Sequence, residues 1–172
     1  MGRSFELFLL ILTFFLLISF NKGLSFKKIS YPQNFHPQVI IEKVEYSVYK
    51  RENLEWKLKA KEIWQNIKGD LWGREILLIN VKKGVRIKGK EGFYFARRNE
   101  FLLRKGVILK TQDNRTVSTE ELKFFPDRGI VVSNKKVIVK EKRMVMKGRG
   151  FIYFVDTGDL RIKEKANVKL KF

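Results

Sequence analysis

Apolar residues recur at every second position through most of this chain, from about Val39 to Phe172. Residues 54–60 read Leu-Glu-Trp-Lys-Leu-Lys-Ala, and residues 168–172 read Val-Lys-Leu-Lys-Phe. A period of two is typical of strands with one buried face, because successive side chains point to opposite sides of a sheet. No stretch of this region keeps a helical period, so the sequence predicts an all-β body.

Turn signals separate the alternating segments at intervals of roughly ten residues. Clear ones are Gly69-Asp70, Asp113-Asn114, Pro126 to Gly129 and Gly158-Asp159. We also expect a turn at Ser133-Asn134, between strands at 130–132 and 137–139. This spacing predicts about ten or more short antiparallel strands in a sandwich, jelly roll or barrel. Residues 63–67 are ambiguous and are compatible with a helical turn.

An almost unbroken apolar run from Phe5 to Phe20 precedes the body. Its length fits either a signal-peptide core or a slightly short transmembrane helix. Because no small-x-small cleavage site follows Phe20, we expect an uncleaved transmembrane signal anchor over residues 1–21. Residues 22–38 then form a proline-containing linker, and residues 39–172 form one domain with a real core. Lysines lie on the C-terminal side of the run, so the positive-inside rule alone favours a cytoplasmic body.

The charge of the chain is strongly positive, with 37 Lys and Arg against 18 Asp and Glu, a net charge of +19. Such a surface attracts polyanions, which include nucleic acids, anionic lipid head groups and acidic proteins. The simpler interpretation is that lysines occupy solvent-facing strand positions and discourage edge-to-edge aggregation. An anchored nucleic-acid-binding or polyanion-binding domain is therefore one alternative, and a structural envelope protein without ligand is another. The aromatic residues alternate inward, which argues against nucleic acid as a partner.

The residue types argue against an enzyme. The chain has 0 Cys and 1 His, and that histidine, His36, lies beside Pro37 in the linker. Gly-Arg-Gly at 148–150 falls far short of a nucleotide-binding motif. Glu120 and Glu121 are neighbours in a strand and point to opposite faces, so they do not form an acid–base pair. We therefore expect no catalytic residues, no metal site and no cofactor.

The last strand alternates to its final residue without a capping element, which is typical of an exposed sheet edge. Its lysines are either gatekeepers against aggregation or part of an edge that binds a partner strand by β-augmentation.

Several short motifs resemble, in order and spacing, the LptC family of lipopolysaccharide-export proteins. They are Trp-Lys-Leu-Lys-Ala at 56–60, Gly-Phe-Tyr-Phe-Ala at 92–96, Leu-Arg-Lys-Gly-Val at 103–107, Thr-Glu-Glu-Leu at 119–122, Gly-Ile-Val-Val-Ser-Asn at 129–134 and Gly-Arg-Gly-Phe at 148–151. Together with the N-terminal apolar run, which distinguishes this family from soluble relatives, the resemblance covers nearly the whole chain. One departure is Lys105-Gly106, where the family usually has Gly and then Asn.

The resemblance implies an open antiparallel β-jelly roll, shaped like a twisted boat or V, after one transmembrane helix. It implies a single-pass inner-membrane protein whose body lies in the periplasm, which resolves the conflict over orientation. In this family, lipopolysaccharide passes from an inner-membrane ABC transporter along the jelly roll to a periplasmic bridge protein of the same superfamily. A soluble, lipid-binding bridge protein is the alternative within the superfamily.

A lipid-carrying role requires an apolar interior, because each exposed CH₂ group costs about 0.8 kcal/mol in water. The large apolar residues of the expected inward face are the candidates, although core packing alone also explains each of them. They are Trp56, Leu58, Phe93, Phe95, Phe101, Leu103, Val107, Leu109, Leu122, Phe124, Val137, Val139, Phe151 and Tyr153. The expected partner edges comprise Val39, Ile41, Val44 and Tyr46 at one end and Val168, Lys169, Leu170, Lys171 and Phe172 at the other.

Overall fold

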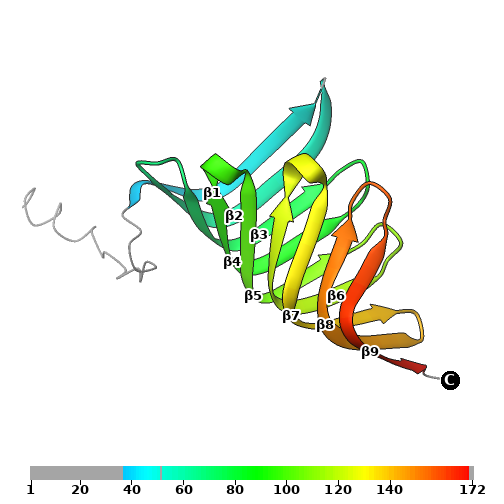
Figure 1. Ribbon diagram of the computed structural model, residues 1–172. Coiled ribbons are helices and arrows are strands. Elements are labelled where there is room, and N and C mark those ends of the chain that lie inside the picture. Colours follow the sequence, from blue (N-terminus) through cyan, green and yellow to red (C-terminus); the bar gives the residue numbers. More distant parts are fainter. Residues whose placement is uncertain (1–36, 51, 171–172) are drawn as a thin grey trace, which may run out of the picture. The chain divides into compact units, whose positions relative to one another are not determined.

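Nine antiparallel strands form one open sheet in the computed structural model, which describes residues 37–50 and 52–170 (Figure 1). Each strand pairs with the next along the chain, so the order is β1-β2-β3-β4-β5-β6-β7-β8-β9. The strands are β1 (Pro37–Lys50), β2 (Asn53–Asn66), β3 (Leu71–Asn80), β4 (Arg86–Phe95), β5 (Glu100–Lys110), β6 (Thr116–Phe125), β7 (Ile130–Glu141), β8 (Met144–Phe154) and β9 (Leu160–Leu170). The expected all-β antiparallel architecture is confirmed, and it is consistent with a jelly roll.

The strands of the described residues are longer than expected, 10 to 14 residues each, because positions such as Ser133-Asn134, where a turn was expected, are bulges inside strands. Ser133-Asn134 does not separate two strands but lies within β7, and the glycines at 148–150 lie within β8. The sheet register shifts at both places. Residues 63–67, which the sequence left ambiguous, belong to a strand as far as Asn66, where β2 ends. A Gly or Asn can mark a bulge as readily as a turn, because both structures use left-handed backbone.

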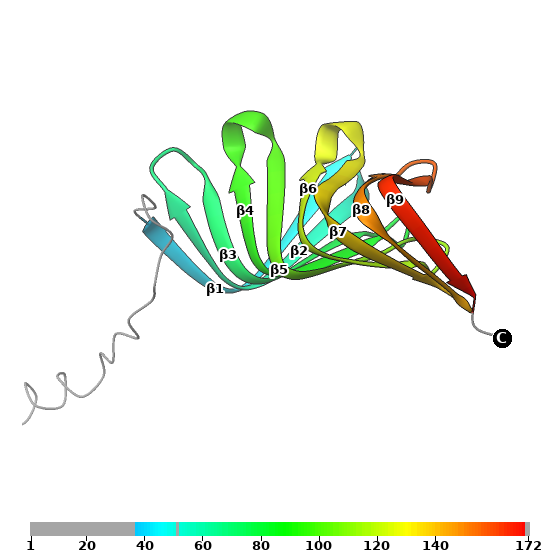
Figure 2. The same cartoon turned by 60° about the horizontal axis from the view of Figure 1, so that its bottom comes forward.

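Residues with a positive φ recur near the middle of several strands. Lys43 in β1, Glu75 in β3, Lys105-Gly106 in β5, Gly150 in β8 and Lys165 in β9 all have this conformation. Bulges bend a strand and increase its twist. The strands bend in this region and curve the whole sheet (Figure 2). Lys105-Gly106, where the chain departs from the usual family pattern, therefore belongs to the bend and not to a turn.

The bend is held in register by charged side chains on one face of the sheet. Glu62, Arg74, Glu91, Arg104 and Glu121 lie directly opposite one another on consecutive strands, with alternating sign. Two of the neighbouring pairs form close ion pairs. The distance is 2.5 Å from Arg74 Nη2 to Glu62 Oε2 and 2.7 Å from Arg104 Nε to Glu121 Oε2. Opposite charges in direct register stabilise one pairing of strands over its alternatives.

Buried hydroxyl groups donate hydrogen bonds to backbone carbonyl oxygens at the bend. The Thr119 hydroxyl donates to the carbonyl oxygen of Lys136 at 2.9 Å, and the Ser133 hydroxyl donates to that of Glu121 at 2.6 Å. A bulge interrupts the ladder of backbone hydrogen bonds, and a buried carbonyl without a donor is costly. These two side chains therefore make the bulges of β6 and β7 compatible with a buried environment.

The bend folds one face of the sheet, which we call the inner face, onto itself. The rings of Trp56 in β2 and Phe124 in β6 lie 4.7 Å apart, although these strands are not neighbours in the sheet. Lys83, in the turn after β3, donates its Nζ to the carbonyl oxygen of Asp156, in the turn after β8, at 2.9 Å. Arg115 likewise donates to the carbonyl oxygen of Gly158 at 2.6 Å. We call the two parts of the sheet that meet in this way, β2 and β3 on one side and β6 to β8 on the other, its opposing sides.

Candidate functional site: the inner face and the two open edges

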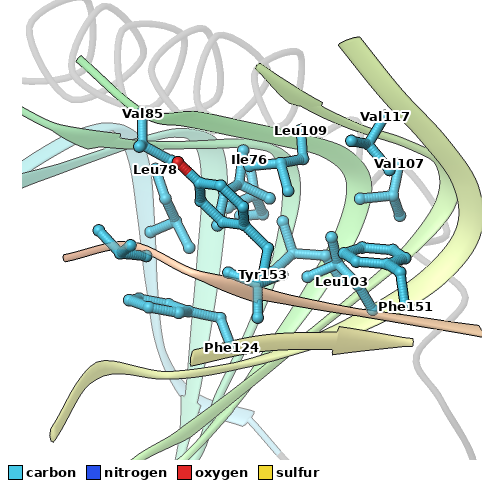
Figure 3. Packing of buried hydrophobic residues seen from close by; sticks show 14 of the residues in the cluster. Ile76, Leu78, Val85, Leu103, Val107, Leu109, Val117, Phe124, Phe151 and Tyr153 are labelled. Carbon is cyan, nitrogen blue, oxygen red and sulfur yellow. The ribbon is translucent and has the colours of Figure 1, made fainter. Parts of the chain in front are cut away.

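Large apolar side chains from β2 to β9 pack together on the inner face. Buried members of the cluster include Leu103, Leu122, Phe124, Phe151 and Tyr153, each no more than 1% exposed. Figure 3 shows Tyr153 within this cluster, with its hydroxyl group on the side of Val85. Since the opposing sides contribute to a single cluster, the inner face is closed in its middle part by its own side chains.

The expected interior residues lie on this face, with two exceptions. Phe93 and Phe95 lie on the opposite, outer face: Phe93 is directly opposite Leu102, while the neighbouring Leu103 belongs to the core. Both faces of β4 carry aromatic residues, since Tyr94 packs on Phe101 at 4.6 Å, so the alternation did not show which side faces inward. The other members all belong to the core cluster or pack against it: Trp56, Leu58, Phe101, Leu103, Val107, Leu109, Leu122, Phe124, Val137, Val139, Phe151 and Tyr153.

An aromatic row on the outer face escaped the sequence analysis. Trp64 and Trp72 stack with ring centroids 4.4 Å apart, and Phe93 continues the row at 6.5 Å from Trp72. Arg74 lies over the ring of Trp64 and Arg104 over that of Phe93. The two tryptophans lie directly opposite each other on paired strands, so the row depends on the register between β2 and β3, which the alternation within each strand does not give.

One small cavity lies between the side chains of the inner face. A cavity of about 20 Å³ lies toward one end, and its lining includes Leu58, Ile63, Leu71, Tyr94 and Phe101. Such a space holds about one water molecule. Gly73 and Gly92 face each other across β3 and β4, and a Cβ atom at either would come within 2.7 or 2.8 Å of Ile76. These two glycines therefore allow Ile76 to fill this part of the interior.

The inner face becomes more exposed toward the two outermost strands. In β1, Ile41 and Tyr46 are 48% and 62% exposed, whereas Val44 packs against the core. In β9, Val168 and Leu170 are 54% and 62% exposed, and they lie opposite Met146 and Met144. Both strands are edges of the nine-stranded sheet, and within the described chain each pairs on one side only.

Of the remaining residues expected at the partner edges, two are exposed and two lie outside the described residues. Val39 in β1 and Lys169 in β9 are exposed. The structure also exposes Ile40, Val48 and Tyr49 of β1, which the sequence analysis did not single out. Lys171 and Phe172 lie outside the described residues, as do the expected anchor at 1–21 and most of the expected linker at 22–38. The strand β1 begins at Pro37, two residues before the expected start of the body.

No helix of the described residues, 37–50 and 52–170, is long and apolar enough to cross a bilayer. The same part of the chain contains no group of three or more His, Cys, Asp or Glu side chains placed to hold a metal ion.

Tyr153 gives the packing of the inner face a measurable pH dependence. Burial raises the pKa of its phenol above the ordinary value of 10.0, and the backbone of Gln112 offsets part of this rise. The unfolded chain therefore ionises first as the pH rises. We expect the contribution of Tyr153 to stability to be complete below about pH 10 and to fall by up to about 1.4 kcal/mol per pH unit between the unfolded and folded pKa values.

Urea unfolding of the wild type and of Tyr153→Phe near pH 9 and near pH 11 measures this effect. The wild type should lose more unfolding free energy than the variant over this interval. Equal losses in the two proteins would show that the phenol does not titrate differently in the folded state.

Comparison with known proteins identifies the family of this chain. The family described as lipopolysaccharide-assembly, LptC-related, matches residues 7–170, which is nearly the whole chain. A comparison with curated proteins gives no match. The family is one of transport-bridge proteins and indicates an involvement in lipopolysaccharide transport. With its single open antiparallel sheet and its match over residues 7–170, the chain belongs to the LptC-related family of lipopolysaccharide-assembly proteins.

Proposed function

We propose that this protein is a bridge component anchored in the inner membrane, whose periplasmic body receives lipopolysaccharide from an ABC transporter and passes it to the next jelly-roll protein. The observation that carries this proposal is an apolar inner face that reaches exposed strands at both edges of the sheet. An amphiphile can keep its acyl chains on such a face while its sugars and phosphates remain in water.

The closed middle of the inner face sets a condition on this function. A cavity of about 20 Å³ does not hold an acyl chain. The opposing sides must therefore separate for loading, and the contact between Trp56 and Phe124 is among those that break. Lipid then replaces the side-chain contacts that are lost, so that the apolar surface stays covered in both states. The structure described here corresponds, in this proposal, to the lipid-free state.

The two edges supply the connections to other proteins. An unpaired edge strand offers a row of backbone donors and acceptors to a strand of another protein. We assign β1 to the periplasmic domain of the transporter and β9 to the downstream bridge protein. Pairing at both edges would continue the sheet, and with it the apolar inner face, from one protein to the next.

Changing Leu170 to Asp should weaken the complex with the downstream bridge protein at least about tenfold. Its side chain is 62% exposed, so the substitution should leave the unfolding free energy nearly unchanged. The downstream strand, however, would bury an unpaired charge. Changing Lys169 to Pro tests the same edge through the backbone, since proline removes a hydrogen-bond donor.

The matched control is Ile67→Asp, which places the same charge at a turn residue that is 78% exposed and far from β9 in the sheet order. Affinity for the downstream protein is measured by titration with the full chain in detergent. Full retention of binding by both β9 variants would contradict the assignment of this edge.

A further inference from the structure

The outer face of the sheet carries two rows of basic and aliphatic side chains that continue from β2 to β9. Direct register pairs define the first row as Lys57, Ile79, Arg86, Lys110, Thr116, Lys140, Val145 and Lys169. They define the second row as Lys59, Leu77, Lys88, Ile108, Ser118, Ile138, Lys147 and Asn167. We call these two rows the basic outer face. Neither row contains an acidic residue.

The cations of this face are largely uncompensated. Lys59 pairs with Glu45 of β1 at 3.1 Å. Within residues 37–50 and 52–170, no ion pair involves Arg86, Lys88, Lys110, Lys140, Lys147 or Lys169, although all of these residues are exposed. The charged residues at the bend, from Glu62 to Glu121, differ from these two rows, because acids and bases alternate there.

Protection against aggregation does not account for the arrangement. Lysines that act as gatekeepers belong on edge strands, whereas Arg86, Lys110 and Lys140 lie on β4, β5 and β7 within the sheet. Arg86 and Lys110 are directly opposite each other. Like charges in this position destabilise strand pairing, so the fold retains them at a cost.

The side chains between the cations indicate what kind of anion this face binds. Five of them are aliphatic and three, Thr116, Ser118 and Asn167, are small and polar; Ile108 and Ile138 remain 38% and 37% exposed beside their basic neighbours. Single-stranded nucleic acids bind to surfaces with exposed aromatic side chains for base stacking. The two rows contain none, and the tryptophans of the outer aromatic row, Trp64 and Trp72, are only 0% and 3% exposed. A mixture of cations and exposed aliphatic groups is typical of surfaces that bind anionic membranes. We propose that the basic outer face binds the anionic surface of a phospholipid bilayer.

This proposal does not depend on lipopolysaccharide transport, since it concerns the opposite face of the sheet. Its consequence is an orientation: with the outer face against the bilayer, the inner face points away from the membrane surface. The attraction is electrostatic, and it should weaken roughly fivefold for each cation removed.

The test uses the full chain in nanodiscs of phosphatidylcholine, either alone or with about 30% phosphatidylglycerol. The chain has 0 Cys, so Ser118→Cys, in the middle of the second row, provides a unique site for an environment-sensitive fluorophore. A nitroxide-labelled lipid reports proximity by quenching. A second reporter at Arg97→Cys, in the turn after β4, serves as the positional control.

We expect strong quenching at Ser118 in the anionic discs, weak quenching in the neutral discs, and loss of the difference at about 1 M salt. Arg97 should show little difference between the discs. Replacing Lys88, Lys110, Lys140 and Lys147 with Gln should reduce the ratio of bound to free outer face several hundredfold. The matched control replaces Lys43, Lys82, Lys135 and Lys142, which are exposed outside the two rows, and it should retain quenching.

Equal quenching at Ser118 in both discs would overturn the proposal, as would equal losses in the two fourfold variants. Displacement of the anionic disc by a single-stranded oligonucleotide at equal phosphate concentration would also overturn it, in favour of nucleic acid. The salt dependence of the unmodified surface decides the question even if a fourfold variant does not fold. A failure here leaves lipopolysaccharide binding by the inner face unaffected, so the two proposals fail separately.

Discussion

Linking the turn after β3 to the turn after β8 should abolish lipopolysaccharide uptake. Lys83 and Asp156 are in contact across the opposing sides, with Nζ 2.9 Å from the Asp156 carbonyl oxygen. In Lys83→Cys/Asp156→Cys, a short and reducible bismaleimide would hold the two sides together. Apparent affinity falls with the fraction of molecules able to open, so we expect uptake to fall at least about tenfold.

The control links Glu45→Cys to Lys59→Cys, which are directly opposite on the neighbouring strands β1 and β2. That link does not join the opposing sides, so it should leave uptake unchanged. Uptake is measured as radiolabelled lipopolysaccharide bound to the full chain, before and after reduction of the link. Undiminished loading of the linked Lys83/Asp156 variant would show that lipid enters without separation of the two sides.

Replacing Phe124 with Ala should lower the unfolding free energy by about 3–5 kcal/mol. Phe124 is 1% exposed, and its ring lies 4.7 Å from that of Trp56 and 6.1 Å from that of Phe101. Truncation removes apolar contacts to both opposing sides and leaves a cavity where they meet. Urea denaturation of the full chain in detergent measures the change.

The next residue provides the control for this substitution. Phe125 is partly exposed on the outer face, where Arg128 lies over its ring at 4.2 Å. Phe125→Ala should lose the cation–π contact and some burial, a total of about 1–2 kcal/mol. If both variants lost the same stability, the inner face would not be the principal core of this sheet.

The alternation of residues was enough to predict an all-β antiparallel body, because burial of one face imposes a period of two on each strand. It also placed Trp56, Leu103, Phe124 and Tyr153 correctly on the face that contains the core. Several turns were predicted correctly for a local reason. Gly129, which ends the expected turn at 126–129, adopts the left-handed conformation directly after a short 3₁₀ turn, a position that favours glycine.

The alternation did not predict the bend, which depends on several strands together; only the family resemblance implied a sheet shaped like a boat or V. Several strands carry a residue with positive φ near the middle, and within a single strand such a residue is indistinguishable from a turn. The parity of the buried residues also changes across the bend: in β6, Val117 and Thr119 are buried on one side of it, and Leu122 and Phe124 on the other. A strict period of two therefore fails at the bend.

The inward face of β4 was predicted wrongly for another reason. Phe93 and Phe95 are more apolar than their neighbours Gly92 and Tyr94, so composition favoured the wrong side of the strand as the inward one. The pairing of Phe93 with Trp72 across β3 and β4 places it on the outer face. Information of this kind lies in the register between strands, which one sequence does not contain.

Photo-crosslinking from the two faces of the sheet tests most directly whether the inner face carries lipid. A photoreactive phenylalanine analogue is placed at Phe101, which packs against the inner cluster, or at Phe125 on the outer face, and both positions are partly exposed. Cells that export lipopolysaccharide should yield a lipopolysaccharide adduct at Phe101 and none at Phe125. Equal adducts at both positions, or an adduct at Phe125 alone, would contradict transport along the inner face.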